Sequence, residues 1–201
     1  VPDTASEHPD AWKFGFPVYH PVDLAAWRAW LAANGETARG VWVVSWRSRS
    51  GRIPVAYAEL VEEALCFGWI DSTVNSLDDE RGMQLMTPRK PKSGWTRLNR
   101  RRVEALEDQG RMTDAGRRVV EAAKANGSWT AYDAVEDLLE PDELAAALDA
   151  VPAARAAWDR FPPSARKQML WWVISSGKSE TRSNRTAKIV AEAASGRRAQ
   201  G

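Results

Sequence analysis

The chain has 201 residues, and its 28 lysine and arginine residues nearly balance 27 aspartate and glutamate residues, for a formal net charge of +1. A chain of this length buries a hydrophobic core without disulfides or a structural metal. The near-neutral balance argues against a protein that its overall charge draws to nucleic acid, so any such attraction must be local.

Cysteine and histidine are both scarce. Cys66 is the only cysteine, and His8 and His20 are the only histidines. A lone thiol forms no internal disulfide and no multi-thiolate zinc site, and two histidines exclude a His-rich metal site. We therefore expect no metal and no cofactor. The cysteine usage fits a reducing cytoplasm.

The sequence shows no recognisable targeting or membrane-spanning signal. No apolar run reaches the roughly 20 residues of a membrane helix, and the first residues lack a basic region followed by an apolar one. We therefore expect a cytoplasmic protein that does not insert into a membrane. No feature specifies an oligomeric state.

Tryptophan is the compositional outlier, with 11 residues. Each tryptophan buries a large area and needs one hydrogen-bond partner for its indole N–H, so core filling is the ordinary interpretation. The alternative for a subset of them is an aromatic wall around a ligand.

The N-terminal half mixes helical and strand patterns. Four prolines in the first 21 residues predict an extended leader over residues 1–20. Asp23 then caps a helix whose apolar residues share one face until Gly35. Residues 40–46 are β-branched and aromatic, which predicts a buried strand.

A second helix and two more strands follow. Residues 54–67 have helical spacing, with Glu63 among the acids assigned to the solvent side. The patterns of residues 69–75 and 82–88 predict two strands joined by an acidic turn. Together with residues 40–46, we expect these strands to form a small antiparallel sheet.

Helical patterns dominate the rest of the chain. The predicted helices cover residues 99–108, 113–126, 141–148, 153–161, 164–176 and 180–195. The predicted fold is therefore α+β and predominantly helical, with a small antiparallel sheet in the N-terminal half and a helical C-terminal half. We expect an α+β region over 21–98, a helical region packed on it over 99–195, and a frayed tail over 196–201.

Several unusual sequence motifs indicate a resemblance to a known family. These are Ala64-Leu-Cys-Phe-Gly-Trp-Ile-Asp71, Thr87-Pro-Arg-Lys-Pro-Lys-Ser-Gly-Trp95, Asn99-Arg-Arg-Arg-Val-Glu104, Met112-Thr-Asp-Ala-Gly116 and Trp171-Trp-Val-Ile-Ser-Ser-Gly-Lys-Ser-Glu-Thr-Arg-Ser-Asn-Arg185. Together, from about Ala26 to Arg198, the chain resembles the YdeI/OmpD-associated family, also called bacteriocin-protection proteins. The resemblance implies a role in tolerance to bacteriocins or cationic antimicrobial peptides and a link to an outer-membrane porin. It implies no particular reaction.

Asp71 is the candidate catalytic residue. It follows a tryptophan and an isoleucine at the start of a strand, where a half-buried carboxylate serves as a general acid or base or orients a ligand. The alternative is a structural ion pair with Arg89 or Arg182. Cys66 lies on the apolar side of a helix, which favours inert burial over a role as nucleophile.

Cations and tryptophans supply the candidate ligand-binding residues. The hypothesis is a basic, aromatic cleft in which arginines fix an anionic group and tryptophans stack on the ligand. The residues assigned to this cleft are Trp69, Arg89, Lys92, Trp95, Arg182 and Arg185. The cations between residues 89 and 102 have a second interpretation, a phosphate-binding run, and a third, a solvated helix face paired with acids.

Three functions compete on these residues. The preferred one is a protein that binds a small anionic or aromatic molecule or a peptide in this cleft, in antimicrobial resistance or stress tolerance. The first alternative is an enzyme, such as a natural-product tailoring or cyclising enzyme, that uses the same cleft with Asp71 as general acid or base. The second is a nucleic-acid-associated protein, which the charge balance does not favour.

Overall fold

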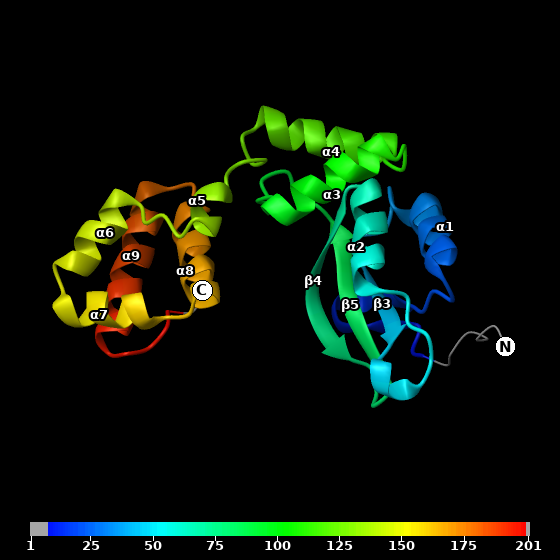
Figure 1. Cartoon of the computed structure of the whole chain (residues 1–201), viewed down its shortest axis with the longest axis horizontal. Helices are drawn as coiled ribbons and strands as arrows, with labels where there is room; N and C mark the ends of the chain where they lie inside the picture. The colour runs from blue at the N-terminus through cyan, green and yellow to red at the C-terminus, as the bar shows by residue number, and fades with distance from the viewer. Residues whose placement is uncertain (1–7, 200–201) are drawn as a thin grey trace. The chain divides into compact units, whose positions relative to one another are not determined.

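A computed structural model describes residues 8–199 and divides the chain into two compact units. The first unit ends at Trp129 and the second begins at Thr130 (Figure 1). Among the described residues, the first unit holds the sheet and the helices up to Ala125, and the second holds the helices from Asp133 to Ala194. The prediction of an α+β, mainly helical fold is confirmed.

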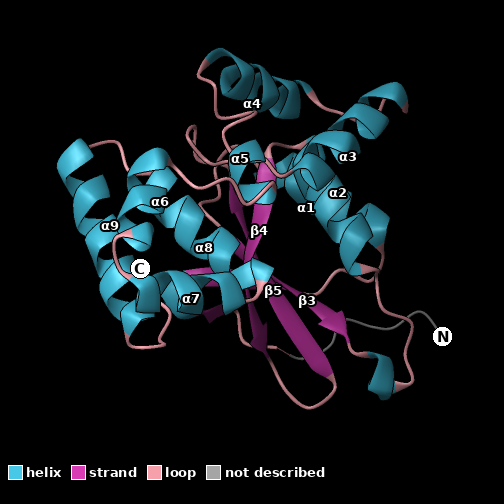
Figure 2. Ribbon diagram, turned by 60° about the vertical axis from the view of Figure 1, so that its left-hand side comes forward, coloured by secondary structure: helices cyan, strands magenta, loops and turns pink. Residues whose placement is uncertain are grey.

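The sheet has the strand order β1-β2-β3-β5-β4 among the described residues, and Figure 2 shows β5 between β3 and β4. Strand β5 pairs antiparallel with both β3 and β4, as the sequence predicts. Strand β2 instead runs parallel to β3, with Val18 opposite Trp42. The bounds are β1 Ala11–Trp12, β2 Phe16–Tyr19, β3 Val41–Trp46, β4 Trp69–Ser76 and β5 Arg81–Pro88.

The expected leader therefore contributes two strands. Residues 1–7 of that prediction lie outside the described residues. In β2, Val18 is buried, and Trp42 of β3 donates its indole N–H to the carbonyl oxygen of Lys13 at 3.1 Å. A four-residue strand that contains a proline shows too little alternation to be recognised from the sequence. The hydrogen-bonded pairing of β2 with β3 fixes this segment against the sheet.

Four α-helices accompany the sheet in the described part of the first unit, residues 8–129. Asp23 caps α1 as predicted, since its Oδ1 accepts from the Ala26 N–H at 2.7 Å. Inside the core, the Trp27 indole N–H donates to the Leu60 carbonyl at 3.0 Å, which ties α1 to α2. The bounds are α1 Leu24–Asn34, α2 Tyr57–Cys66, α3 Arg97–Asp108 and α4 Asp114–Ala125.

Glu63 corrects one sequence-based assignment. The sequence places it with the solvent-facing acids, but only 3% of it is exposed. Arg28 of α1 binds its carboxylate at 2.6 Å, and Arg111 binds the other carboxylate oxygen. A carboxylate is buried at tolerable cost only with such partners, and they come from distant parts of the chain.

Between residues 130 and 199, the second unit consists of five α-helices around their own core. Buried residues of this core include Leu144, Trp158, Leu170 and Ile189. No helix within residues 8–199 combines the length and apolarity that spanning a bilayer requires. The bounds are α5 Asp133–Glu136, α6 Asp142–Asp149, α7 Pro152–Arg160, α8 Pro163–Ile174 and α9 Ser179–Ala194.

The first compact unit includes two helices that follow the sheet. It ends after Trp129 and therefore contains α3 and α4. Helices α3 and α4 belong to the first unit because Val103, Leu106 and Val120 bury their side chains in the same core as α2. Helical periodicity shows that a helix has an apolar face but not which core receives it.

Gly116 allows α4 to approach the end of α2 closely. A methyl group at this position would lie 2.8 Å from the Cys66 carbonyl carbon and closer still to its oxygen. Alanine normally favours a helix over glycine by about 1 kcal/mol. We nevertheless predict that Gly116→Ala lowers the free energy of unfolding by about 1–3 kcal/mol, measured by urea denaturation, because the backbone must shift.

Gly82→Ala is the matched control for this prediction. Gly82 lies in the same unit, and a methyl group there meets no heavy atom closer than 3.8 Å. Its substitution should leave the denaturation midpoint nearly unchanged. A Gly116→Ala protein as stable as the wild type would contradict the close approach.

Candidate functional site

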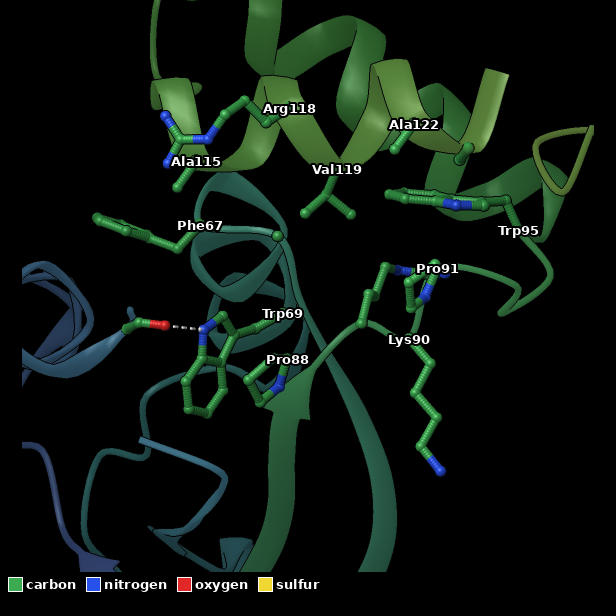
Figure 3. Close-up of a pocket in the computed structure, with 14 residues that line it drawn as sticks. Phe67, Trp69, Pro88, Lys90, Pro91, Trp95, Ala115, Arg118, Val119 and Ala122 are labelled. Atoms are coloured by element: carbon green, nitrogen blue, oxygen red, sulfur yellow. Dashed lines mark hydrogen bonds between the residues drawn. The ribbon is translucent and has the colours of Figure 1, made fainter. Parts of the chain in front are cut away.

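A cavity of about 270 Å³ lies in the first unit, where the end of β5, the turn between α2 and β4, and helix α4 meet (Figure 3). We call it the β5–α4 pocket. Its walls are mostly apolar and aromatic, with few charged groups. The lining residues are Gly35, Phe67, Gly68, Trp69, Pro88, Arg89, Lys90, Pro91, Trp95, Ala115, Arg118, Val119, Ala122 and Ala123.

Trp69 and Pro88 form one side of the pocket. They are paired across β4 and β5, so the sheet register brings them together. Trp69 is 1% exposed, and its indole N–H donates to the Gly35 carbonyl at 3.0 Å (Figure 3). This hydrogen bond satisfies the polar edge of the ring and holds the ring in place.

Helix α4 forms the opposite side. Thr113 positions its first turn, since the Thr113 hydroxyl donates to the Cys66 carbonyl at 2.6 Å and accepts from the Gly116 N–H at 3.3 Å. Gly68 has a φ of 76°, and a methyl group there would lie 2.6 Å from Cγ2 of Val119. Glycine is required at this turn for both reasons. The close fit brings Val119 towards Trp69 and Phe67 (Figure 3).

Arg89 supplies a buried cation at the pocket wall. It is 8% exposed, and its guanidinium carbon lies 3.6 Å from the ring centre of Trp95. Its Nη1 donates to Ser93 Oγ and to the Gly94 carbonyl, both at 3.2 Å. Its Nε is buried and has no hydrogen-bond partner within the described part of the chain. Burial lowers the pKa of Arg89 to about 10, against an opposing effect of Asp71, so the side chain remains charged at neutral pH.

The loop that carries Arg89 is attached to the far end of α4. The Pro91 carbonyl accepts hydrogen bonds from Asn126 Nδ2 at 2.8 Å and from Ser128 Oγ at 3.2 Å. The ring centres of Trp95 and Trp129 lie 4.9 Å apart. The start of α4 is therefore bound to the turn after α2, and the residues after its end are bound to the loop that carries Arg89.

Asp71 lies outside the set of residues that line the pocket. It is half-buried, and its Oδ2 accepts a short hydrogen bond from the hydroxyl of Tyr57 on α2. Burial, and then the hydrogen bond and charge of Asp71, raise the pKa of Tyr57 to about 12. Sequence reasoning missed Tyr57 because it lies 14 residues earlier, at the start of a helix with no catalytic motif.

The structure brings together three of the predicted ligand-binding residues. Trp69, Arg89 and Trp95 all line the β5–α4 pocket, whereas Lys92 is exposed and is not among the lining residues. Arg182 and Arg185 belong to the second unit.

Within that unit, the Arg185 guanidinium donates to the Trp172 carbonyl at 2.5 Å and lies 5.1 Å from the centre of the Trp172 ring. The Nε of Arg182 is buried and has no hydrogen-bond partner within residues 8–199. Arg185 of α9 therefore contacts Trp172 of α8, which gives it a structural role in its own unit.

The apolar lining was also missed by sequence reasoning. Phe67, Pro91 and Val119 carry no chemical signal of their own, and the helical period of α4 gives no indication that it faces a pocket. The one available signal was the density of aromatic and proline residues between 67 and 95.

The cationic run continues onto α3. Arg102 Nε lies 3.8 Å from a Glu62 oxygen, and Arg102 Nη1 donates to Asn99 Oδ1 at 3.1 Å, whereas Arg101 is exposed. Part of the run is therefore paired along the helix surface. Residues 8–199 contain no group of three or more histidine, cysteine, aspartate or glutamate side chains placed to hold a metal ion.

The fold and the pocket define a protein with an α+β unit that holds a small, mostly apolar pocket and with a separate helical unit. Residues 19–119, half of the chain, match the family described as a domain of unknown function (DUF8412), and the chain belongs to that family. Residues 138–196 match the family described as "Bacteriocin-protection, YdeI or OmpD-Associated".

The second match confirms the resemblance stated from the sequence, over a shorter range than Ala26 to Arg198. Most of the first unit, including β4, β5 and the lining residues up to Val119, falls in the match to the domain of unknown function. Neither the curated proteins nor the solved structures contain a match.

The Tyr57–Asp71 pair gives a testable prediction. We expect Asp71→Asn to lower the pKa of Tyr57 from about 12, because the substitution removes the negative charge that disfavours tyrosinate. Ultraviolet titration of tyrosinate would measure it, with Tyr57→Phe identifying the signal. An unchanged titration in Asp71→Asn would contradict the pairing.

Proposed function

We propose that the first unit binds a small anionic molecule with an aromatic or apolar body in the β5–α4 pocket. The observation that carries the proposal is Arg89, a buried cation at the wall of an apolar pocket, with one N–H group that has no hydrogen-bond partner in residues 8–199. Pockets of this composition, with few polar groups that fix orientation, are typical of small-molecule sites.

The energetics of Arg89 favour an anionic ligand. A buried donor without a partner costs about 1–3 kcal/mol, and more when it is charged. Trp95 compensates part of the cost, since its π face attracts the guanidinium. An anion in the pocket would supply the missing hydrogen bond and a counter-charge in surroundings of low polarity.

The size of the pocket limits the ligand. Small-molecule sites usually span about 300–1,000 Å³, so a cavity of about 270 Å³ suits a compact molecule with one or two rings. A peptide would place at most one side chain inside.

The biological role that we propose is antimicrobial resistance or stress tolerance. Its support is the match of residues 138–196 to a family described by bacteriocin protection. We assign ligand binding to the first unit. The second unit, which carries the match to this family, connects the protein to bacteriocin protection.

Binding is better supported than catalysis by Asp71. A general acid or base must reach the ligand within hydrogen-bonding distance, and Asp71 is not among the pocket-lining residues. Its hydroxyl partner, Tyr57, has a pKa of about 12 and therefore keeps its proton at neutral pH.

The fluorescent two-ring anion dimethylaminonaphthalene sulfonate provides a direct test of the pocket. We predict that the folded wild type binds it and that Arg89→Met weakens binding about tenfold to a hundredfold, because a hydrogen bond to a charged group contributes about 1.5–3 kcal/mol. Fluorescence titration would measure the affinities, and circular dichroism would verify that the variant is folded.

Arg101→Met is the matched control for that measurement. It removes the same charge from an exposed position outside the pocket lining, so affinity should remain close to that of the wild type. Ala122→Trp, which fills the pocket from α4 without removing a charge, should also abolish dye binding. Equal dye affinity in the wild type, Arg89→Met and Ala122→Trp would refute the proposal.

A growth assay tests the biological role. We predict that cells without the protein are killed at lower bacteriocin concentrations and that the wild-type gene restores tolerance. Arg89→Met at the same protein level should restore less, because the pocket has lost its anion-binding group. If Arg89→Met restored tolerance fully, anion binding in the pocket would not be needed for resistance, which would contradict the prediction.

A further inference from the structure

The hydrogen bonds of Arg89 are made from one side of its guanidinium group. Nη1 donates to Ser93 and Gly94 at 3.2 Å each. Nε is buried without a partner in residues 8–199, and neither of these two bonds involves Nη2. The N–H groups of Nε and Nη2 point in parallel from the same edge of the planar group, and together they form a two-donor fork.

Trp95 restricts the direction of approach. Its ring centre lies 3.6 Å from the guanidinium carbon, so the ring covers one face of the planar group. A ligand that uses the edge formed by Nε and Nη2 must therefore lie in the guanidinium plane. A carboxylate is planar and carries two oxygens at the spacing of this fork, which permits two parallel hydrogen bonds.

The charges around the pocket favour a single negative charge on the ligand. Arg118 also lines the pocket, but it is exposed and its Nη2 lies 3.2 Å from a Glu36 oxygen. The Lys90 side chain is exposed and is directed away from Trp95 and α4 (Figure 3). Asp71 adds a negative charge close enough to affect Arg89. A dianion would bring one uncompensated charge into an apolar cavity.

We infer that the pocket is specific for a monocarboxylate with an aromatic or apolar body, whose carboxylate lies side-on against Nε and Nη2 of Arg89. The inference rests on the proposed function and narrows its ligand from any small anion to one chemical class. Arg89 selects the carboxylate, and the aromatic and aliphatic lining accommodates the body.

Three matched compounds test the class. Naphthylacetate, naphthylacetamide and naphthylmethylphosphonate share one ring system and carry a carboxylate, a neutral amide and a phosphonate. Calorimetric titration of the whole protein should give the tightest binding for the carboxylate, by at least about tenfold over the other two, as expected when a buried fork loses a charged partner. An amide or phosphonate that binds as tightly as the carboxylate overturns the inference.

Arg89→Lys tests the fork. Lysine keeps the positive charge but offers no planar pair of donors. The variant should lose about tenfold in affinity for naphthylacetate and should no longer distinguish the carboxylate from the phosphonate. Wild-type affinity and discrimination in Arg89→Lys would overturn the side-on geometry.

The Nε–H signal of Arg89 in NMR spectra gives a readout that general loss of stability does not mimic. The signal is assigned by its disappearance in Arg89→Lys, and it should shift on addition of naphthylacetate but not of the amide. Dye binding that depends on Arg89, without naphthylacetate binding, overturns this inference and leaves the proposed function intact. Loss of both in the wild type overturns the proposed function as well.

Discussion

The first unit depends on the contact between the start of α4 and the turn that ends α2. The Cys66 carbonyl accepts two hydrogen bonds from Thr113, from its N–H at 3.1 Å and from its hydroxyl at 2.6 Å. Gly116 and Gly68 leave no side chain in the way. Without this contact, α4 would not face Trp69, and the pocket would have no second wall.

The same helix fixes the pocket from its other end. Asn126, just after α4, holds the Pro91 carbonyl, so the loop that carries Arg89 is attached to the helix that faces it. A pocket whose two sides are linked in this way is formed before a ligand arrives, which reduces the entropy lost on binding. The buried charge of Arg89 follows from that arrangement, because only a fixed loop can hold a guanidinium on Trp95 without a counter-ion in direct contact.

Prediction from the sequence succeeded where the signal was local. Asp23 caps α1 and the antiparallel strands β4 and β5 meet in the expected order, since capping chemistry and alternation act over a few residues. It failed for Glu63, whose buried carboxylate is bound by Arg28 and Arg111. These arginines lie 35 and 48 residues away in the sequence. In the site, aromatic and charged residues drew attention to Trp69, Arg89 and Trp95, whereas the α4 side of the pocket had no recognisable pattern.

By itself the sequence determined the α+β class, most helix and strand positions and the family resemblance of the C-terminal region. The tertiary structure alone decided that Arg89 is buried on Trp95 with its Nε unpaired within residues 8–199, that Asp71 pairs with Tyr57 outside the pocket, and that Arg182 and Arg185 belong to the other unit. The reason is that hydrophobic period and capping depend on neighbours in sequence, whereas burial of a charge depends on which distant elements come to surround it.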